Sequence, residues 1–462
     1  MPAPSNTLLI EGSFAELVDE LAQYIDTVCK SEAGSGVQSQ IAPTLGEIRE
    51  KEQAEEPADP ASIQTQKDEV LKKVVGKAAA LNTAPEKEFT AAYNLLIHLS
   101  NQSPSRDMFL NRICSYLSEQ PVASSAQFGP SLALTTLTTI FNILPNNSES
   151  RYHVFMAILK VIRSTSNNAA FDALTPQLNT NVPKWVVAWD LDDEDARSLH
   201  VAIADVAAAS GDHDMSYKYL LHGLETIPSD SASEAESRDL AKRTLVAALT
   251  NPTITDFNPL IDREAIQALR DSDSGLFDLL NIFASDDYAA YTEFLESNPL
   301  TSIDLPESAA EMLETKIRLL TIASLAAGAT NRSLPYSTIS DALQIPKEDV
   351  EMWMIDAIRA GLVEGKLSQL KQEFLVQRAT YRVFGPKQWS EIQGRLMVWQ
   401  RSLEGVLSLV KSEREKFERE GAGGDDMQQN GERRFGGYRG QGGRGGRNQN
   451  HQPREVDFVG GD

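Results

Sequence analysis

The residues that could hold a metal ion gather in one short stretch of the sequence. Asp212, His213 and Asp214 follow one another, and His222 comes nine residues after His213. Imidazole and carboxylate groups both bind zinc, so the residue types fit such a site. The spacing does not, because nine residues place two side chains on opposite faces of a helix and no third histidine lies nearby. We interpret the stretch as a capped, solvated turn and predict no metal site.

A run of four acids could supply the carboxylate pair of a general acid–base catalyst. The run comprises Asp192, Asp193, Glu194 and Asp195. No residues stand in the pattern of a nucleophile and its base, and no glycine-rich phosphate loop precedes a helix. Acids in such a run favour the N-terminus of the helix that follows. The sequence therefore predicts no catalytic residue, no cofactor and no enzyme activity.

Arginine and glycine dominate the sequence after residue 420, which lacks the apolar content to fold. Residues 431–454 contain six arginines and one acid, Glu432, so this segment carries +5 and the rest of the chain −28 of the net −23. Such tracts bind RNA weakly through phosphate charge and through stacking on bases. The alternative is a solubilising tail with methylated arginines. The RNA-contact candidates are Arg433, Arg434, Phe435, Tyr438, Arg439, Arg444 and Arg447.

The whole chain has the composition of an intracellular protein without disulfide bonds. Its 462 residues carry a formal net charge of −23, which opposes binding of polyanions by the body of the protein. The two cysteines, Cys29 and Cys114, are too few for a disulfide framework or a cysteine zinc site. No secretory signal opens the sequence, and the most apolar run, 319–329, is too short to span a bilayer. We expect a cytoplasmic protein that binds no membrane.

Apolar residues at three- and four-residue steps predict helices over most of the chain. Residues 1–30 form one such pattern, and 86–300 form a long series whose clearest unit is a helix pair around a Gly211-Asp212 turn. Stacked helix pairs make a solenoid of the TPR or HEAT type, so the fold class is mainly α. Prolines are expected to end the helices, at Pro104, Pro121, Pro145, Pro176, Pro228 and Pro252.

Residues 334–377 predict a short helix, a turn, a longer helix and a two-stranded hairpin, which is the order of a winged helix. Ile339 and Leu343 give the first helix an apolar face, and Gly361 is placed to cap the second. Strands are expected at 362–370 and 374–377, around a Lys371-Gln372 turn.

The charges of this winged helix argue against DNA binding. The second helix carries four acids, Glu348, Asp349, Glu351 and Asp356, against Lys347 and Arg359, whereas groove-reading helices supply cations to phosphates. Protein contact is the remaining use, with the last strand serving as an edge for another sheet. The interface candidates in that strand are Phe374, Leu375 and Val376.

A heptad pattern follows the winged helix. Its apolar positions are spaced alternately three and four residues apart, which is typical of a coiled coil or helix bundle. One interpretation is that this helix packs on its own domain, and the other is that it is buried against partner helices. The interface candidates are Trp389, Ile392, Leu396, Trp399, Leu403, Val406 and Val410.

A helical array that ends in a winged helix and a long helix resembles the PCI-domain family. That family includes subunits of the proteasome lid, the COP9 signalosome and translation initiation factor 3. The matching segments are 278–283 with Asp287-Tyr288, 316–323, 357–363 and 365–369. Residues 380–385, followed by Trp389 and Trp399, resemble one subunit of the initiation factor. The alternatives are a scaffold similar to COP9 signalosome subunit 7 and an RNA-binding regulator that acts through the arginine- and glycine-rich tail.

The resemblance implies a non-catalytic scaffold subunit of translation initiation factor 3 that assembles through its PCI domain and C-terminal helix. Its implied partners are other PCI and MPN subunits and, through the complex, the 40S ribosomal subunit, in support of mRNA and initiator tRNA recruitment. No DNA partner is expected. The expected parts are an N-terminal helix (1–30), an acidic and partly flexible linker (31–84), a helical-repeat region (85–204), a PCI domain (205–378, with a helical part 205–330 and a winged helix 331–378), a bundle helix (379–420) and a disordered tail (421–462).

Overall fold

The computed structural model describes residues 12–30, 36–53, 60–119, 128–165, 168–303, 305–329, 331–382 and 386–422. The chain divides into two units, residues 1–384 and 385–462. In the described ranges, none of the helices combines the length and apolarity needed to cross a lipid bilayer.

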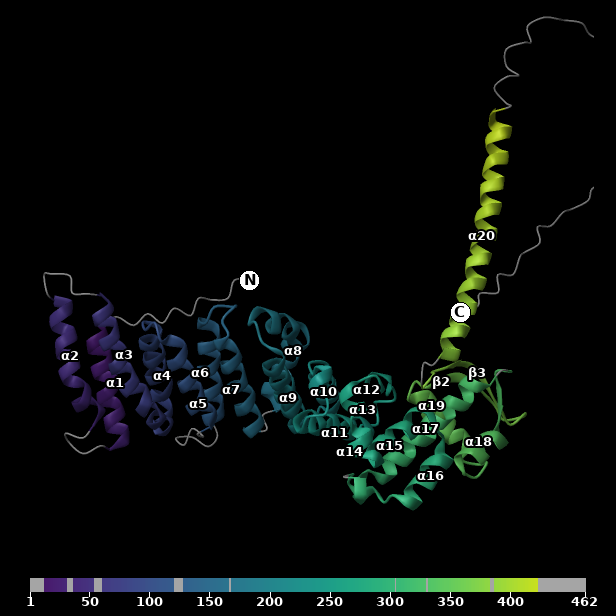
Figure 1. Cartoon of the computed structure of the whole chain (residues 1–462), viewed down its shortest axis with the longest axis horizontal. Helices are drawn as coiled ribbons and strands as arrows, with labels where there is room; N and C mark the ends of the chain where they lie inside the picture. The colour runs from purple at the N-terminus through teal and green to yellow at the C-terminus, as the bar shows by residue number, and fades with distance from the viewer. Residues whose placement is uncertain are drawn as a thin grey trace, which may run out of the picture. The chain divides into compact units, whose positions relative to one another are not determined.

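The first unit opens with helices that pack around one apolar core (Figure 1). Ser13 and Glu16 form a capping box at the start of the first helix, in which each side chain accepts a hydrogen bond from the other residue's backbone N–H. The predicted N-terminal helix is thereby confirmed. The elements are α1 (Phe14–Cys29), α2 (Val37–Gln53), α3 (Pro60–Lys77), the 3-10 helix η1 (Ala78–Thr83), α4 (Glu86–Asn101), α5 (Arg106–Glu119), α6 (Gly129–Ile143) and α7 (Ser150–Thr165).

The expectation of a linker over 31–84 is wrong for most of that range, because α2, α3 and η1 occupy it. Ile41, Leu45 and Ile48 recur at helical steps in α2 and are fully or almost fully buried. Val70 and Val74 do the same in α3. The acids between these apolar positions lower the average hydropathy without breaking the apolar stripe, so composition alone misjudges the segment.

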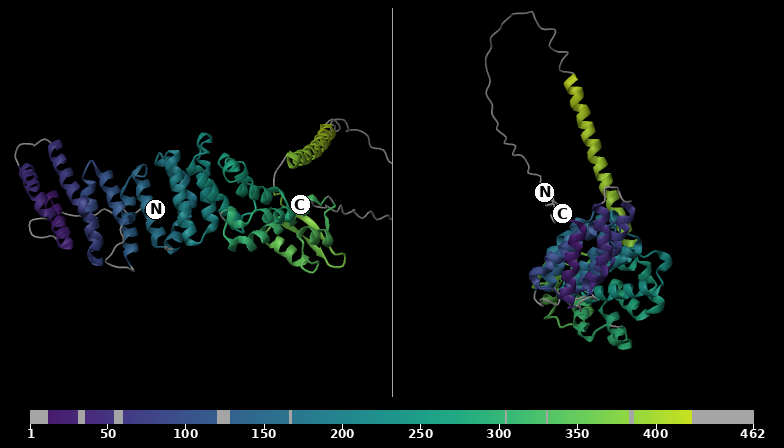
Figure 2. Two further views of the ribbon diagram at one scale, coloured as in Figure 1. Left: turned by 60° about the horizontal axis from the view of Figure 1, so that its bottom comes forward. Right: turned by 90° about the vertical axis from the view of Figure 1, so that its left-hand side faces the viewer.

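A second core begins at α7, which has one face in each core. Val154, Ala157 and Val161 belong to the first core, and Phe155 and Leu159 to the second. The helices that follow continue the row (Figure 2). They are α8 (Asn168–Ala188), α9 (Asp193–Ser210), α10 (His213–Glu225), η2 (Ser229–Ser231), α11 (Ala235–Thr250), α12 (Asn258–Ile261), α13 (Glu264–Gln267), α14 (Leu269–Ser272), α15 (Ser274–Ser285), α16 (Tyr288–Ser297), η3 (Leu300–Ile303), η4 (Glu307–Ala309) and α17 (Ala310–Gly328).

The helix pair predicted around Gly211 is α9 and α10. Gly211 takes a φ of 85°, a left-handed conformation that glycine adopts without steric cost, and ends α9. The side chain of Asp212 then accepts a hydrogen bond from the Met215 N–H and starts α10.

Pro176 does not end a helix, contrary to the prediction. It lies inside α8 together with Pro183. A proline inside a helix removes one backbone hydrogen bond, and α8 tolerates this loss twice while burying Phe171, Leu178 and Val182. Pro104, Pro145, Pro228 and Pro252 lie between helices as expected, and Pro121 lies outside the described residues.

The winged helix closes the first unit. It consists of β1 (Ser333–Pro335), α18 (Tyr336–Leu343), α19 (Val350–Arg359), β2 (Val363–Ser368) and β3 (Glu373–Ala379). Gly361 has a φ of 72° and ends α19 as predicted. The strand order is β1-β3-β2, with both pairs antiparallel, so β3 is the central strand. The second unit contains α20 (Pro386–Ala422).

Cations from later segments close the C-terminal ends of buried helices. Lys316 of α17 is 3% exposed, and its Nζ donates to the carbonyls of Ala248 (2.6 Å) and Asn251 (2.7 Å) at the end of α11. The ammonium also lies 5.0 Å from the centre of the Phe257 ring. Arg151 donates in the same way to the carbonyl of Leu144 at the end of α6 (2.8 and 3.1 Å). These donors satisfy carbonyls that a helix end leaves without partners.

Stability should depend on the protonation of Lys316. Burial lowers its pKa to about 7, whereas an unfolded lysine keeps a pKa of about 10.4. Between these values the unfolded chain binds a proton that the folded chain does not, so the free energy of unfolding rises with pH, by at most about 1.4 kcal/mol per pH unit. Lys316→Met lacks this titration. The stability that it loses relative to the natural chain should therefore grow from pH 6.5 to pH 8.5 in urea unfolding.

Lys218→Met is the matched control, because Lys218 is exposed on α10 and should change stability by less than about 0.5 kcal/mol at either pH. If Lys316→Met lowered the free energy of unfolding by the same amount at all pH values, the carbonyls and the Phe257 ring would be keeping the amine charged.

Candidate functional site

The predicted capped turn at residues 212–214 is confirmed, and its acids serve as hydrogen-bond acceptors. Asp214 accepts from the side chains of Asn251 (2.6 Å) and Thr253 (2.5 Å), and these bonds lower the pKa of its carboxyl. Among the described residues, no group of three or more histidine, cysteine or acidic side chains could hold a metal ion.

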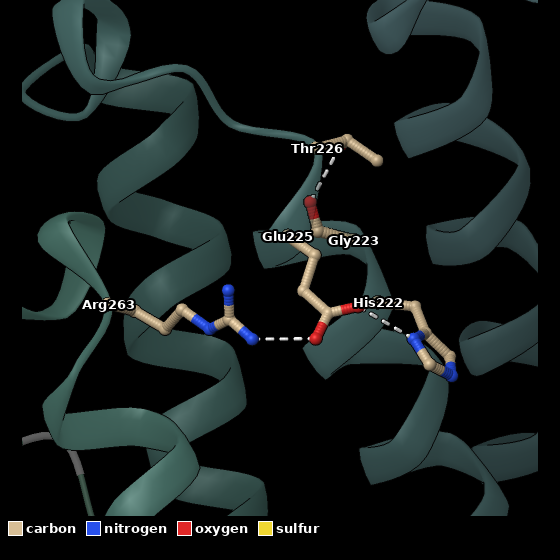
Figure 3. A network of polar contacts seen from close by, with 5 residues as sticks. All are labelled: His222, Gly223, Glu225, Thr226 and Arg263. Atoms are coloured by element: carbon tan, nitrogen blue, oxygen red, sulfur yellow. Dashed lines mark hydrogen bonds and ion pairs between the residues drawn. The ribbon is translucent and has the colours of Figure 1, made fainter.

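His222 takes part in a polar network instead of a metal site (Figure 3). Its Nδ1 lies 3.0 Å from one carboxylate oxygen of Glu225, and the other oxygen accepts from Arg263 at 2.6 Å. Hydrogen bonds from His222 and Arg263, opposed by burial, lower the pKa of Glu225. The network ties α10 to the residue that precedes α13.

The acids at 192–195 cap α9 as predicted. Asp192 accepts from the backbone N–H of Asp195 at 2.8 Å, and the other three acids occupy the first turn. Their charges favour the positive end of the helix.

The second helix of the winged helix exposes both charged and apolar side chains on one face. Glu348, Met352, Ile355 and Arg359 follow one exposed stripe on and just before α19. Arg359 pairs with Asp356 at 3.2 Å, which engages one of the few cations in this region. The stripe therefore offers acids and exposed apolar groups, which suit a protein partner better than a phosphate backbone.

The last strand of the winged helix is not an edge, contrary to the prediction. Because β1 pairs with its other side, β3 has neighbours on both sides. Phe374 is fully buried and Val376 is 8% exposed, so these two candidates belong to the domain core, whereas Leu375 is 41% exposed. In the described part of the sheet, β2 is the longer outer strand and β1 spans three residues.

Helix α20 carries the exposed apolar seam that the heptad pattern predicts. Trp399 and Leu403 are each 68% exposed, and Ile392 is half-buried. Trp389, Leu396, Val406 and Val410 are also exposed on this face. Exposed rows of large apolar side chains are typical of surfaces that bind another protein. The RNA-contact candidates between Arg433 and Arg447 lie outside the described residues.

Two family models match the second half of the chain. The PCI domain model matches residues 289–378, and the model described as eIF3 subunit M, C-terminal helix, matches residues 382–409. Eukaryotic translation initiation factor 3 subunit M of Coccidioides immitis is 55% identical to this chain over the full length of both. The protein of the same name from Aspergillus clavatus is 57% identical, over 91% of this chain and 88% of its own.

The chain belongs to the family of initiation factor 3 subunit M. The predicted membership of the PCI-domain family is confirmed, with a match over 289–378 of the predicted 205–378, and so is the assignment to the initiation factor. The alternative, a COP9 signalosome subunit, is set aside because the matched relatives and the C-terminal helix model both carry the name of subunit M.

The subunit M match to the C-terminal helix begins at Arg382, a residue whose role the sequence did not reveal. Its guanidinium is buried, and it donates to the carbonyls of Ile282 (3.0 Å), Phe283 (2.5 Å) and Asp286 (2.5 Å) at the end of α15. Burial lowers its pKa to about 10. Arg382 thus fixes the segment that follows β3 to the end of α15, just before α20 begins.

Arg382→Met should lower the free energy of unfolding by about 2–4 kcal/mol, because it leaves buried helix-end carbonyls without donors. Urea unfolding and hydrogen exchange of α15 amides measure the loss. Arg378→Met is the control, since Arg378 is exposed and forms a surface ion pair with Glu364. Equal stability of the two variants would contradict a fixing role for Arg382.

Proposed function

We propose that this chain is a non-catalytic scaffold subunit of the initiation factor 3 complex. The observation that carries the proposal is the exposed seam of α20, which lies within the segment matched by the subunit M helix model. A protein that stayed alone would keep these side chains in water. Burial of a large apolar side chain contributes about 1.5–3 kcal/mol, so pairing with partner helices removes a substantial cost.

The spacing of the seam supports burial in a helix bundle. Steps of three and four residues keep one narrow stripe facing a neighbouring helix along several turns. Trp399 and Leu403 lie near its middle, where interface residues with the largest effects on affinity cluster. The partners in the proposal are the other PCI and MPN subunits of the factor.

A second assembly surface in the proposal is the outer edge of β2. An outer strand has backbone donors and acceptors that can pair with a strand of another subunit. Leu375 is exposed on the neighbouring central strand and could add a side-chain contact. Through the assembled factor, the subunit would support binding of the 40S ribosomal subunit and recruitment of mRNA and initiator tRNA in the cytoplasm.

Trp399→Asp or Leu403→Asp should release the chain from the complex while its own fold persists. A charged side chain in the seam opposes its burial against a partner helix. A loss of 2 kcal/mol or more in binding free energy corresponds to at least about 30-fold weaker binding. The measurement is capture of the other factor subunits by the tagged chain, together with thermal unfolding of each purified variant.

Val398→Asp is the matched control, because Val398 is similarly exposed at 62% but lies on another face of α20. Unfolding of the seam variants would show that the seam is an internal core. Equal release by all three variants would show that the seam has no special role.

RNA binding by the tail is a second candidate function, supported by its composition. Residues 431–454 contain six arginines. If all six contact single-stranded RNA, a plot of the logarithm of the binding constant against the logarithm of the salt concentration should have a slope of up to about −4. Deletion of residues 423–462 should remove this dependence in filter-binding or anisotropy titrations. Replacement of the six arginines by lysine should retain the charge but weaken binding through lost stacking. A truncated chain with unchanged affinity and salt slope would place RNA binding in the folded body.

A further inference from the structure

Helix α19 exposes two large apolar side chains on one face. Met352 is 65% exposed and Ile355 is 40% exposed. Glu348 just before the helix and Arg359 at its end continue the same stripe, at steps of four, three and four residues. We call these four residues the α19 stripe. The steps are those with which one helix presents a seam to another.

The fold does not need these two apolar side chains for its own core. The opposite face of α19 already supplies that core, because Val350, Met354 and Ala357 are each 0% exposed. Met352 and Ile355 are therefore apolar beyond what packing within the domain requires, and a contact outside the domain accounts for them.

Acidic side chains outnumber cations around the α19 stripe. On and just before α19, four acids and two cations give a formal charge of −2; they are Glu348, Asp349, Glu351, Asp356, Lys347 and Arg359. Arg359 is already paired with Asp356. By contrast, a groove of about 800 Å³ lined by α5, α7, α9 and α11 carries four cations and four acids, so its charge favours no class of partner.

The wing lies against the start of α19 and adds a third apolar side chain. Gln369 Nε2 donates to Glu351 Oε2 at 2.9 Å, which holds the turn between β2 and β3 beside the first turn of α19. Leu370 follows in this turn and is 97% exposed. The other Glu351 oxygen accepts from the hydroxyl of Tyr336 on α18 at 3.3 Å. Contacts within the winged helix therefore hold this surface in place without a partner.

We propose that the α19 stripe and Leu370 bind a basic amphipathic helix of a partner protein. Leucines of that helix contact Met352, Ile355 and Leu370, and its lysines or arginines pair with Glu348 and Asp349, as charges beside a helix seam do. The acids oppose the phosphates of a nucleic acid at the same place. This surface includes no residue of α20, so the proposal does not depend on assembly through the α20 seam.

The size of α19 sets the length and the affinity of the partner helix. Its ten residues correspond to about 15 Å, which about three turns of a second helix cover. A helix of three turns is barely stable alone in water, so the partner segment must fold as it binds. That ordering lowers the affinity, and we expect dissociation constants on the order of 10–100 μM.

The test titrates the full chain into fluorescein-labelled peptides of about 18 residues and follows their anisotropy. A basic series places leucine at three- and four-residue steps with lysine on both flanks. An acidic series carries glutamate in place of lysine, and a scrambled series keeps the basic composition without the stripe. A fourth peptide is residues 431–454 of this chain, which contain six arginines and no aliphatic seam. The basic series should bind at least about tenfold more tightly than the other three.

Variants of the stripe separate its apolar contacts from its charges. Met352→Ser combined with Ile355→Ser should weaken binding of the basic series about tenfold and leave its salt dependence unchanged. Glu348→Lys should weaken binding at least about threefold and reduce its salt dependence. Glu20→Lys makes the same charge change at an exposed position of α1 and should have little effect. Trp399→Asp should leave peptide binding unchanged, which shows that the peptide is not held by the α20 seam.

Thermal unfolding of each purified variant verifies its fold, and Met352→Gln replaces the double variant if that protein unfolds early. Saturating basic peptide should also slow hydrogen exchange of the α19 amides. Equal binding of the scrambled series, or tighter binding of the acidic series or of residues 431–454, would overturn the proposal. So would equal effects of Glu348→Lys and Glu20→Lys, or loss of binding in Trp399→Asp. The assembly proposal would stand in each case, because capture of the other subunits tests it separately.

Discussion

The fold depends on donors that reach helix ends from distant parts of the chain. A helix leaves its last carbonyls without partners, and a solenoid that stacks short helices buries many such ends. Arg151, Lys316 and Arg382 supply side-chain nitrogen donors to the ends of α6, α11 and α15. A charged donor without these carbonyls would be costly to bury, so each cation and its helix end require one another. Arg382 adds polar contacts to the continuous apolar core that joins α15 and α17 to the winged helix.

Features set by residues close together in the sequence could be predicted, whereas features set by residues far apart could not. The α9–α10 pair was predictable because its signals are local: an apolar stripe, a glycine with positive φ and a capping aspartate. Arg382 was not, because its acceptors lie 96 to 100 residues earlier in the chain. The strand β1 has three residues and one buried side chain, Leu334, which is too little for a periodic signal. Without β1, the central strand β3 resembled an edge.

The candidate surfaces differ in the same way, because one lies within a single helix and the other is formed by several helices. The α20 seam could be predicted because a heptad pattern lies within one helix, and most of its residues are exposed in the described part of the second unit. A groove lined by α5, α7, α9 and α11 could not be predicted from the sequence, because four helices contribute to it and only their spacing creates the space.

The position of α7 in two cores has a consequence for how the chain can come apart. Repeat proteins gain stability from contacts between neighbours, so an end can open in steps while the rest stays folded. Opening from the N-terminus through α1–α6 would mainly disrupt the first core, although Phe141 of α6 also packs against the second, whereas loss of α7 would also remove Phe155 and Leu159 from the second core. We therefore expect the stepwise opening of helices from the N-terminus to end at α7. A protease that cleaves within α1–α6 would leave a resistant fragment that begins near Ser150 and contains the segment matched by the PCI model.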